Sequence, residues 1–164
     1  MNPVVVFQTS LGAFEVELYA DRSPLTVKNF LDYVAESYYD QTIFHRVISN
    51  FMIQGGGFTV NGQQKATRAA IRNESGNGVK NIRYAIAMAR TSDLHSATSQ
   101  FFINVKDNDF LDQNQYCAFG KVVAGTEVIE KIKAVRTGSH GPHQDWPLQN
   151  VVIQSARLKA PPQQ

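Results

Sequence analysis

A chain of 164 residues has the length of about one domain, because domains commonly run to roughly 100–200 residues. Hydrophobic residues make up 43% of it, which excludes a disordered chain. The formal net charge is only +2, so we expect no dedicated binding of nucleic acid. The single cysteine, Cys117, excludes an internal disulfide and a cysteine-based zinc site.

The ends and the apolar segments bear on the location of the chain. No segment approaches the ~20 consecutive apolar residues of a membrane span. The start, Met1–Phe7, lacks the basic and apolar regions of a signal peptide. We therefore expect one soluble, cytoplasmic, monomeric domain over residues 1–164 that uses no membrane, with residues 159–164 as a frayed tail.

The first elements in chain order are a hairpin and a helix. Apolar residues alternate with polar ones over Ala13–Leu18, a period that predicts a strand with one buried face. Another strand, Val4–Thr9, precedes it, and the break at Ser10–Gly12 suits the turn of a hairpin. Ser23 as the cap and a proline at the first helical position then predict a helix over Pro24–Glu36.

The rest of the chain is rich in short apolar runs. A second helix is predicted over Glu127–Val135, and Thr59–Gly78 has the polar, glycine-bearing composition of a long surface loop. The helices do not alternate with the strands, which argues against a doubly wound parallel sheet. We expect a mainly β fold, a closed eight-stranded antiparallel barrel capped by two helices, because closure removes exposed strand edges. The six later strands are predicted at Ile43–Ile48, Phe51–Gln54, Tyr84–Ala89, Phe101–Val105, Tyr116–Val123 and Val151–Leu158.

Arg46 is the unusual residue of the first of these later strands. Strict alternation places it on the same face as Phe44 and Ile48. A guanidinium above an apolar surface is costly to desolvate unless it has a use. The alternative is an arginine on the solvent side of an amphipathic strand.

Further motifs have structural and functional interpretations. The run Gly55–Gly57 lacks a following Gly-Lys-Ser/Thr and a helix, so it favours a β-bulge or a close backbone approach over a phosphate cradle. The adjacent rings of Phe101 and Phe102 must point to opposite faces of a strand, one toward the core and one toward a surface or groove. The segment 140–145 holds His140, His143 and Asp145, which would bind a metal only adventitiously. Cys117 is interpreted as an inert small hydrophobe.

Four segments together resemble the cyclophilin family of peptidyl-prolyl cis–trans isomerases, and its bacterial cytosolic-type members in particular. They are Phe44–Gly56 (FHRVISNFMIQGG), Ile86–Thr91 (IAMART), Ser96–Ile103 (SATSQFFI) and Phe119–Val122 (FGKV). The resemblance extends in order from Val4 to about Leu158. It implies an eight-stranded antiparallel barrel with a helix at each end, and an isomerase that needs neither cofactor nor metal.

The resemblance also implies an active groove on the outside of the barrel. Arg46, Phe51 and Gln54 are the expected catalytic residues, with Arg46 donating to the prolyl nitrogen of a twisted amide. The expected substrate-binding residues are Met52, Ala89, Arg90, Thr91, Gln100, Phe102, Phe110, Leu111 and Tyr116. The implied partners are proline-containing peptides and unfolded or folding proteins. A non-catalytic proline-peptide-binding module or chaperone that uses the same groove is the alternative.

Two positions depart from the pattern of the best-known eukaryotic members. Phe110 stands where those members carry tryptophan, and Tyr116 where they carry histidine. Neither change removes the arginine on which isomerisation is expected to depend. The absence of an indole N–H at position 110 predicts weak binding of cyclosporin.

Overall fold

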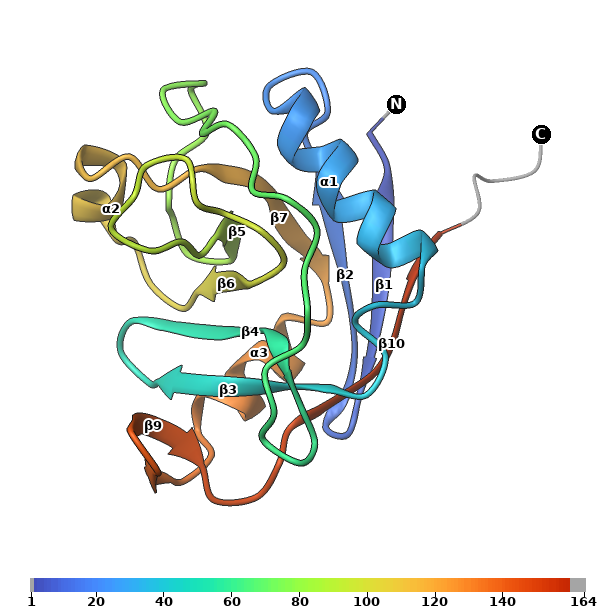
Figure 1. Ribbon diagram of the computed structural model, residues 1–164, viewed down its shortest axis with the longest axis vertical. Helices are drawn as coiled ribbons and strands as arrows, with labels where there is room; N and C mark the ends of the chain where they lie inside the picture. The colour runs from blue at the N-terminus through green and yellow to red at the C-terminus, as the bar shows by residue number, and fades with distance from the viewer. Residues whose placement is uncertain (1, 160–164) are drawn as a thin grey trace.

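Eight strands close into an antiparallel barrel in the computed structural model, which describes residues 2–159 (Figure 1). The order around the barrel is β1-β10-β3-β4-β6-β5-β7-β2. This architecture confirms the fold class predicted from the short, apolar, turn-separated runs. The strands are β1 (Val4–Thr9), β2 (Gly12–Leu18), β3 (Thr42–Ile48), β4 (Met52–Thr59), β5 (Ala85–Met88), β6 (Phe101–Asn104), β7 (Ala118–Ala124) and β10 (Val152–Leu158).

Two helices, α1 (Pro24–Ala35) and α3 (Thr126–Lys133), lie where periodicity predicts them, within two residues. Each buries one stripe against the barrel, through Phe30 and its neighbours in α1 and through Ile129 and Ile132 in α3. A third, short helix, α2 (Asp109–Gln113), was not predicted. Five residues are too few to show a helical period, so the polar turn before Phe110 gave no indication of it.

The core inside the barrel is aromatic, and Phe101 of β6 lies at its centre. The centroid of its ring lies 5.6 Å from those of Phe7 and Phe30 and 5.4 Å from that of Tyr39. The next residue, Phe102, points outward and belongs to a separate apolar cluster. The prediction that these adjacent rings point to opposite faces of one strand is therefore confirmed.

A two-stranded sheet, β8 (Thr137–His140) and β9 (His143–Pro147), packs on the outside of β3 (Figure 1). The sequence predicted no strand there. Trp146 of β9 is buried against Ile43 and Phe58 and so fastens the hairpin to the barrel. Among the described residues, no group of three or more histidine, cysteine, aspartate or glutamate side chains is arranged to hold a metal ion.

The segment between β4 and β5 is a long loop, as predicted for Thr59–Gly78, and Glu74 ties it to the start of α1. The Glu74 carboxylate accepts hydrogen bonds from the backbone N–H of Thr26 at 2.6 Å and from its hydroxyl at 2.7 Å. A carboxylate at this place satisfies N–H groups that the first helical turn leaves without partners. The loop is therefore anchored to the barrel rather than hanging from it.

The C-terminal part of the chain differs in one respect from the expectation of a frayed tail over 159–164. Lys159 donates its backbone N–H to the Val4 carbonyl at 2.7 Å, and its ammonium pairs with Glu15 at 2.9 Å. The rest of the expected tail, residues 160–164, lies outside the described residues. Over residues 2–159, none of the helices has the length and apolar character needed to cross a membrane.

His45 of β3 is enclosed by the β8–β9 hairpin. Its ring centroid lies 4.4 Å from that of Phe58 and 5.8 Å from that of Trp146, and its Nδ1 has no hydrogen-bond partner among the described residues. Burial, together with the nearby charges of His143 and Arg46, lowers the pKa of His45 to about 4. The buried ring is therefore neutral in the folded protein near neutral pH.

This pKa predicts a loss of stability in acid. Between pH 6.5 and pH 4 the unfolded chain binds a proton on His45 that the folded chain does not, so the free energy of unfolding falls by about 3 kcal/mol. Urea unfolding at pH 7 and pH 4 measures the drop. His45→Phe should make it smaller by about that amount. An equal drop in wild type and His45→Phe would contradict the assignment.

Candidate active site

A β-bulge in β3 turns Arg46 to the outside of the barrel. Phe44 pairs with Gly55 and Arg46 pairs with Gln54, so His45 is an extra residue opposite the β4 backbone. A bulge reverses the alternation of side chains beyond it. Phe44 therefore enters the core while Arg46 is exposed, and the prediction that both share one face was wrong.

A cavity of about 500 Å³ lies beside Arg46 on the outer face of the barrel. Side chains from β3, β4 and β6, from the end of β5 and from α2 converge on it. Ten of the twelve residues proposed from the sequence line this cavity, and Thr91 and Gln100 do not. The lining residues are Arg46, Phe51, Met52, Gln54, Ala89, Arg90, Phe102, Phe110, Leu111, Asn114 and Tyr116.

Side-chain hydrogen bonds connect Arg46 through Gln54 to Gln100. The Arg46 guanidinium donates to Gln54 Oε1 over 3.4 Å, and Gln54 Nε2 donates to Gln100 Oε1 at 2.9 Å. Gln100 lies over Gly57, where an added Cβ would stand 2.5 Å from the Gln100 side chain. The close approach predicted for the glycine run is thus confirmed, and it makes room for the residue that holds Gln54.

The floor of the cavity is apolar. Met52, Phe102 and Leu111 are at most 4% exposed and pack together with Ala87 and Ala118 in a cluster outside the barrel core. Phe51 partly covers this cluster and stacks on Phe110, with the ring centroids 5.5 Å apart. Phe110 itself is 48% exposed. The cavity therefore has a fixed floor and a solvent-facing edge.

Arg90 forms the opposite rim. Its guanidinium lies 4.4 Å from the centroid of the Tyr116 ring and donates to the carbonyls of Asn114 at 2.7 Å and Thr91 at 2.9 Å. Asn114 lines the cavity but was missed, because its place depends on the unpredicted helix α2. Thr91 instead pairs its hydroxyl with Ser96 at 2.8 Å in a turn.

Buried asparagines hold α2 and Phe51 in place. Asn81 donates from its backbone and its side chain to one carboxylate oxygen of Asp112 in α2, both at 2.9 Å. Asn108 donates to the Phe51 carbonyl at 2.9 Å, and Asn104 links to both Asn81 and Asn108. Asn81, Asn104 and Asn108 are at most 1% exposed. Sequence reasoning missed this network, because Asn81 and Asn108 lie in polar segments, where asparagines are ordinarily solvated, and Asn104 is the last residue of the apolar strand β6.

This arrangement of barrel and cavity can be set beside known proteins. The family model described as cyclophilin type peptidyl-prolyl cis-trans isomerase/CLD matches residues 4–158. The chain belongs to this family. The resemblance based on the four sequence segments is therefore confirmed. The enzyme class that it implied, peptidyl-prolyl cis–trans isomerase, is confirmed as well.

Relatives of this cyclophilin are similar over nearly their whole length. The peptidyl-prolyl cis-trans isomerase cyp18 of Streptomyces antibioticus is 55% identical over 161 residues, which cover 94% of this chain and 97% of that protein. The peptidyl-prolyl cis-trans isomerase B of Escherichia coli (strain K12) is 53% identical over 162 residues, which cover 94% and 99%.

Solved structures resemble this cyclophilin as well. A crystal structure of a cyclophilin type isomerase from Cryptosporidium parvum is 26% identical and superposes with a TM-score of 0.84 over 99% of this chain and 100% of that one. A second structure of that protein, determined in the presence of the dipeptide Ala-Pro, gives a TM-score of 0.82 at 26% identity over 96% and 99%.

Proposed function

We propose that this cyclophilin accelerates rotation about X–Pro peptide bonds of peptides and of unfolded or folding proteins in the cavity beside Arg46. The observation that carries the proposal is the position of the Arg46 guanidinium. It is exposed beside an apolar floor, and over residues 2–159 it forms no ion pair. Its charge is therefore free to interact with a bound peptide.

The chemistry needs no nucleophile and no proton transfer. Resonance gives the peptide bond a rotation barrier of ~18–20 kcal/mol, and X–Pro bonds isomerise in tens to hundreds of seconds. Rotation removes the resonance, and the prolyl nitrogen then carries a lone pair that accepts a hydrogen bond. A donor aimed at this nitrogen stabilises the twisted state more than either planar state, which is the requirement for catalysis. Arg46 is this donor in the proposed mechanism.

The other cavity residues divide the remaining work. Met52, Phe102 and Leu111, with Phe51, hold the proline ring against the apolar floor. Gln54, supported by Gln100, orients the Arg46 guanidinium or the carbonyl of the substrate. The backbone of Arg90 holds the chain on the N-terminal side of the proline, so that one side of the bond is fixed while the other rotates.

A non-catalytic module that only binds proline-containing peptides would use the same cavity. A protease-coupled assay on a short Ala-Pro-Phe peptide distinguishes the two functions, because the protease cleaves only the trans isomer. Faster appearance of cleaved peptide supports the isomerase. Peptide binding without any acceleration would support the binding module instead.

Arg46→Ala is expected to lower kcat/KM by roughly one to three decades, because a hydrogen bond from a charged donor contributes ~1.5–3 kcal/mol and a preorganised donor to the transition state contributes about 10²–10³ in rate. Peptide affinity should change far less. Arg46→Lys should also be poor, since an ammonium lacks the planar fork of the guanidinium. The protease-coupled assay measures the rate, and thermal unfolding checks that this exposed substitution leaves the fold intact. Activity of Arg46→Ala within twofold of wild type would exclude the mechanism.

Gln100→Leu tests whether the support of Gln54 matters. The substitution keeps the approximate volume but removes the acceptor for Gln54 Nε2. A hydrogen bond of this kind contributes about 1 kcal/mol, so kcat/KM should fall about fivefold, less than in Arg46→Ala. If Gln100→Leu retains full kcat/KM at unchanged melting temperature, Gln54 positions itself without this partner.

Phe110→Trp tests the expected weakness of cyclosporin binding. Phe110 sits at the exposed edge of the cavity and offers a ligand carbonyl no N–H donor. An unpaired buried carbonyl costs ~1–3 kcal/mol, so the indole should tighten cyclosporin binding at least about tenfold. The value of kcat/KM should change little, because the apolar floor and Arg46 are untouched. Inhibition and turnover curves for both proteins decide the matter, and nanomolar binding by wild type would refute the donor argument.

A further inference from the structure

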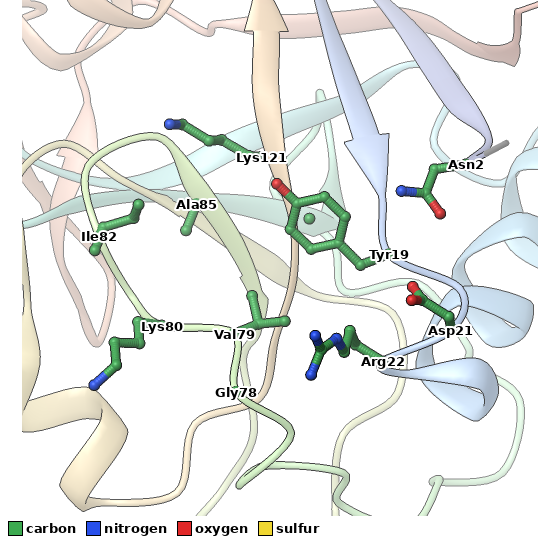
Figure 2. Close-up of a pocket in the computed structure, with 11 residues that line it drawn as sticks. Asn2, Tyr19, Asp21, Arg22, Gly78, Val79, Lys80, Ile82, Ala85 and Lys121 are labelled. Atoms are coloured by element: carbon green, nitrogen blue, oxygen red, sulfur yellow. The ribbon is translucent and has the colours of Figure 1, made fainter.

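A second hollow, of about 450 Å³, lies where β2 leads into α1 and where β7 passes the segment 78–85 (Figure 2). It shares no lining residue with the cavity beside Arg46. Tyr19 and Arg22 stand on one side, and Val79 faces them from the other (Figure 2). Lys80, Ile82 and Lys121 also line the hollow.

The charge of this hollow is unbalanced. Three cations, Arg22, Lys80 and Lys121, line it against one carboxylate, Asp21, and a second carboxylate, Glu17, lies beside it opposite Lys121 in the β2–β7 pair. Within residues 2–159, none of these three cations is paired with a carboxylate. Arg22 makes only a 3.4 Å contact with the Asn77 carbonyl. The hollow therefore keeps an excess of positive charge and favours an anionic ligand, with the side chains of Lys80 and Lys121 extending outward at its rim (Figure 2).

The hollow is also apolar at its centre. The ring of Tyr19 and the side chains of Val79 and Ile82 form this part, and Ile82 is 40% exposed. A simple inorganic anion would leave these surfaces wet. An aliphatic or aromatic group flanked by negative charge would cover them and pair with the cations at the same time.

We propose that the hollow binds an acidic peptide segment, with one apolar side chain between Tyr19 and Val79 and neighbouring carboxylates on the three cations. Asp21 favours a peptide over a nucleic acid, because a peptide backbone offers N–H donors to its carboxylate and a phosphodiester backbone offers none. This is a binding activity beyond isomerisation and does not depend on it.

The wall between the two sites is shared. Val79 lines the hollow and also packs against the apolar cluster under the active cavity, and Asn81 holds Asp112 of α2. A client chain is therefore able to place an acidic segment in the hollow while a proline occupies the cavity nearby. Joint occupation raises the effective concentration of the proline at the cavity.

The test is a titration of the ¹⁵N-labelled full chain with the peptide N-acetyl-Glu-Asp-Leu-Phe-Glu-amide, which contains no proline. The amides of Gly78, Lys80 and Lys121 should shift, and those of Arg46 and Ala89 should stay nearly fixed. The double substitution Arg22→Glu with Lys80→Glu should weaken binding about tenfold, equivalent to about 1.4 kcal/mol. Its matched control is Lys131→Glu with Arg136→Glu, two exposed cations elsewhere that also lack ion pairs in the described chain, and it should bind like wild type.

Three results would overturn the proposal. They are shifts confined to the cavity beside Arg46, an equal loss of affinity in both double variants, and tighter binding of a single-stranded oligonucleotide than of the peptide. The amide spectrum itself reports whether each variant is folded, and Ile82→Ala, which should also weaken binding, tests the apolar part without a charge change. Turnover of the Ala-Pro-Phe peptide is measured separately, so failure here and failure of the isomerase are distinguishable.

Discussion

The pairing of β3 with β4 is the constraint on which the candidate active site depends. The extra residue at His45 shifts the register, so that Phe44 fills the core while Arg46 stands outside next to Gln54. The β4 backbone can approach this closely because Gly55 has no side chain; a Cβ there would lie 2.9 Å from the Ile43 carbonyl. The bulge in β3 and the glycine run in β4 therefore act together to place the Arg46 guanidinium on the outside of the barrel.

Two apolar clusters on opposite faces of the same strands support the cavity beside Arg46. Phe101 belongs to the cluster inside the barrel and Phe102 to the cluster under the cavity, so one strand serves stability with one residue and the site with the next. Catalysis by selective binding of a twisted amide requires that the donor and the ring pocket keep a fixed separation. The strand pairing contributes to this, because the β3–β4 ladder joins Arg46 to Gln54 and the β4–β6 ladder joins Gln54 to Phe102.

The elements that could be predicted from the sequence are those with a clear local period of apolar residues. The alternation in β2 and the apolar stripe of α1, with proline at its start, were sufficient for the hairpin, the helix and the barrel class. The predicted cap, Ser23, makes no capping hydrogen bond with its side chain. The bulge at His45 was not predictable, because strict alternation holds until a non-local pairing breaks it. The same is true of α2, of the β8–β9 hairpin and of the asparagines at 81, 104 and 108, whose burial depends on segments far apart in the chain. Most residues that line the cavity were predicted through family resemblance, whereas Asn114 and the hydrogen bond between Gln54 and Gln100 required the structure.

Residues of the cavity differ in how much a substitution would disturb the packing around them. Phe102 is 4% exposed and contacts Tyr116 edge-on, so a change there would disturb the floor. Phe110 is half exposed, and among the described aromatic rings it stacks only on the partly buried Phe51. A bound proline ring needs the floor, while a larger ligand also reaches the edge. Substitution at the edge therefore alters which large ligands are held without altering the geometry between Arg46 and the floor. If the proposed function is correct, this separation would allow one scaffold to keep its rotation chemistry while its affinity for bulky ligands varies.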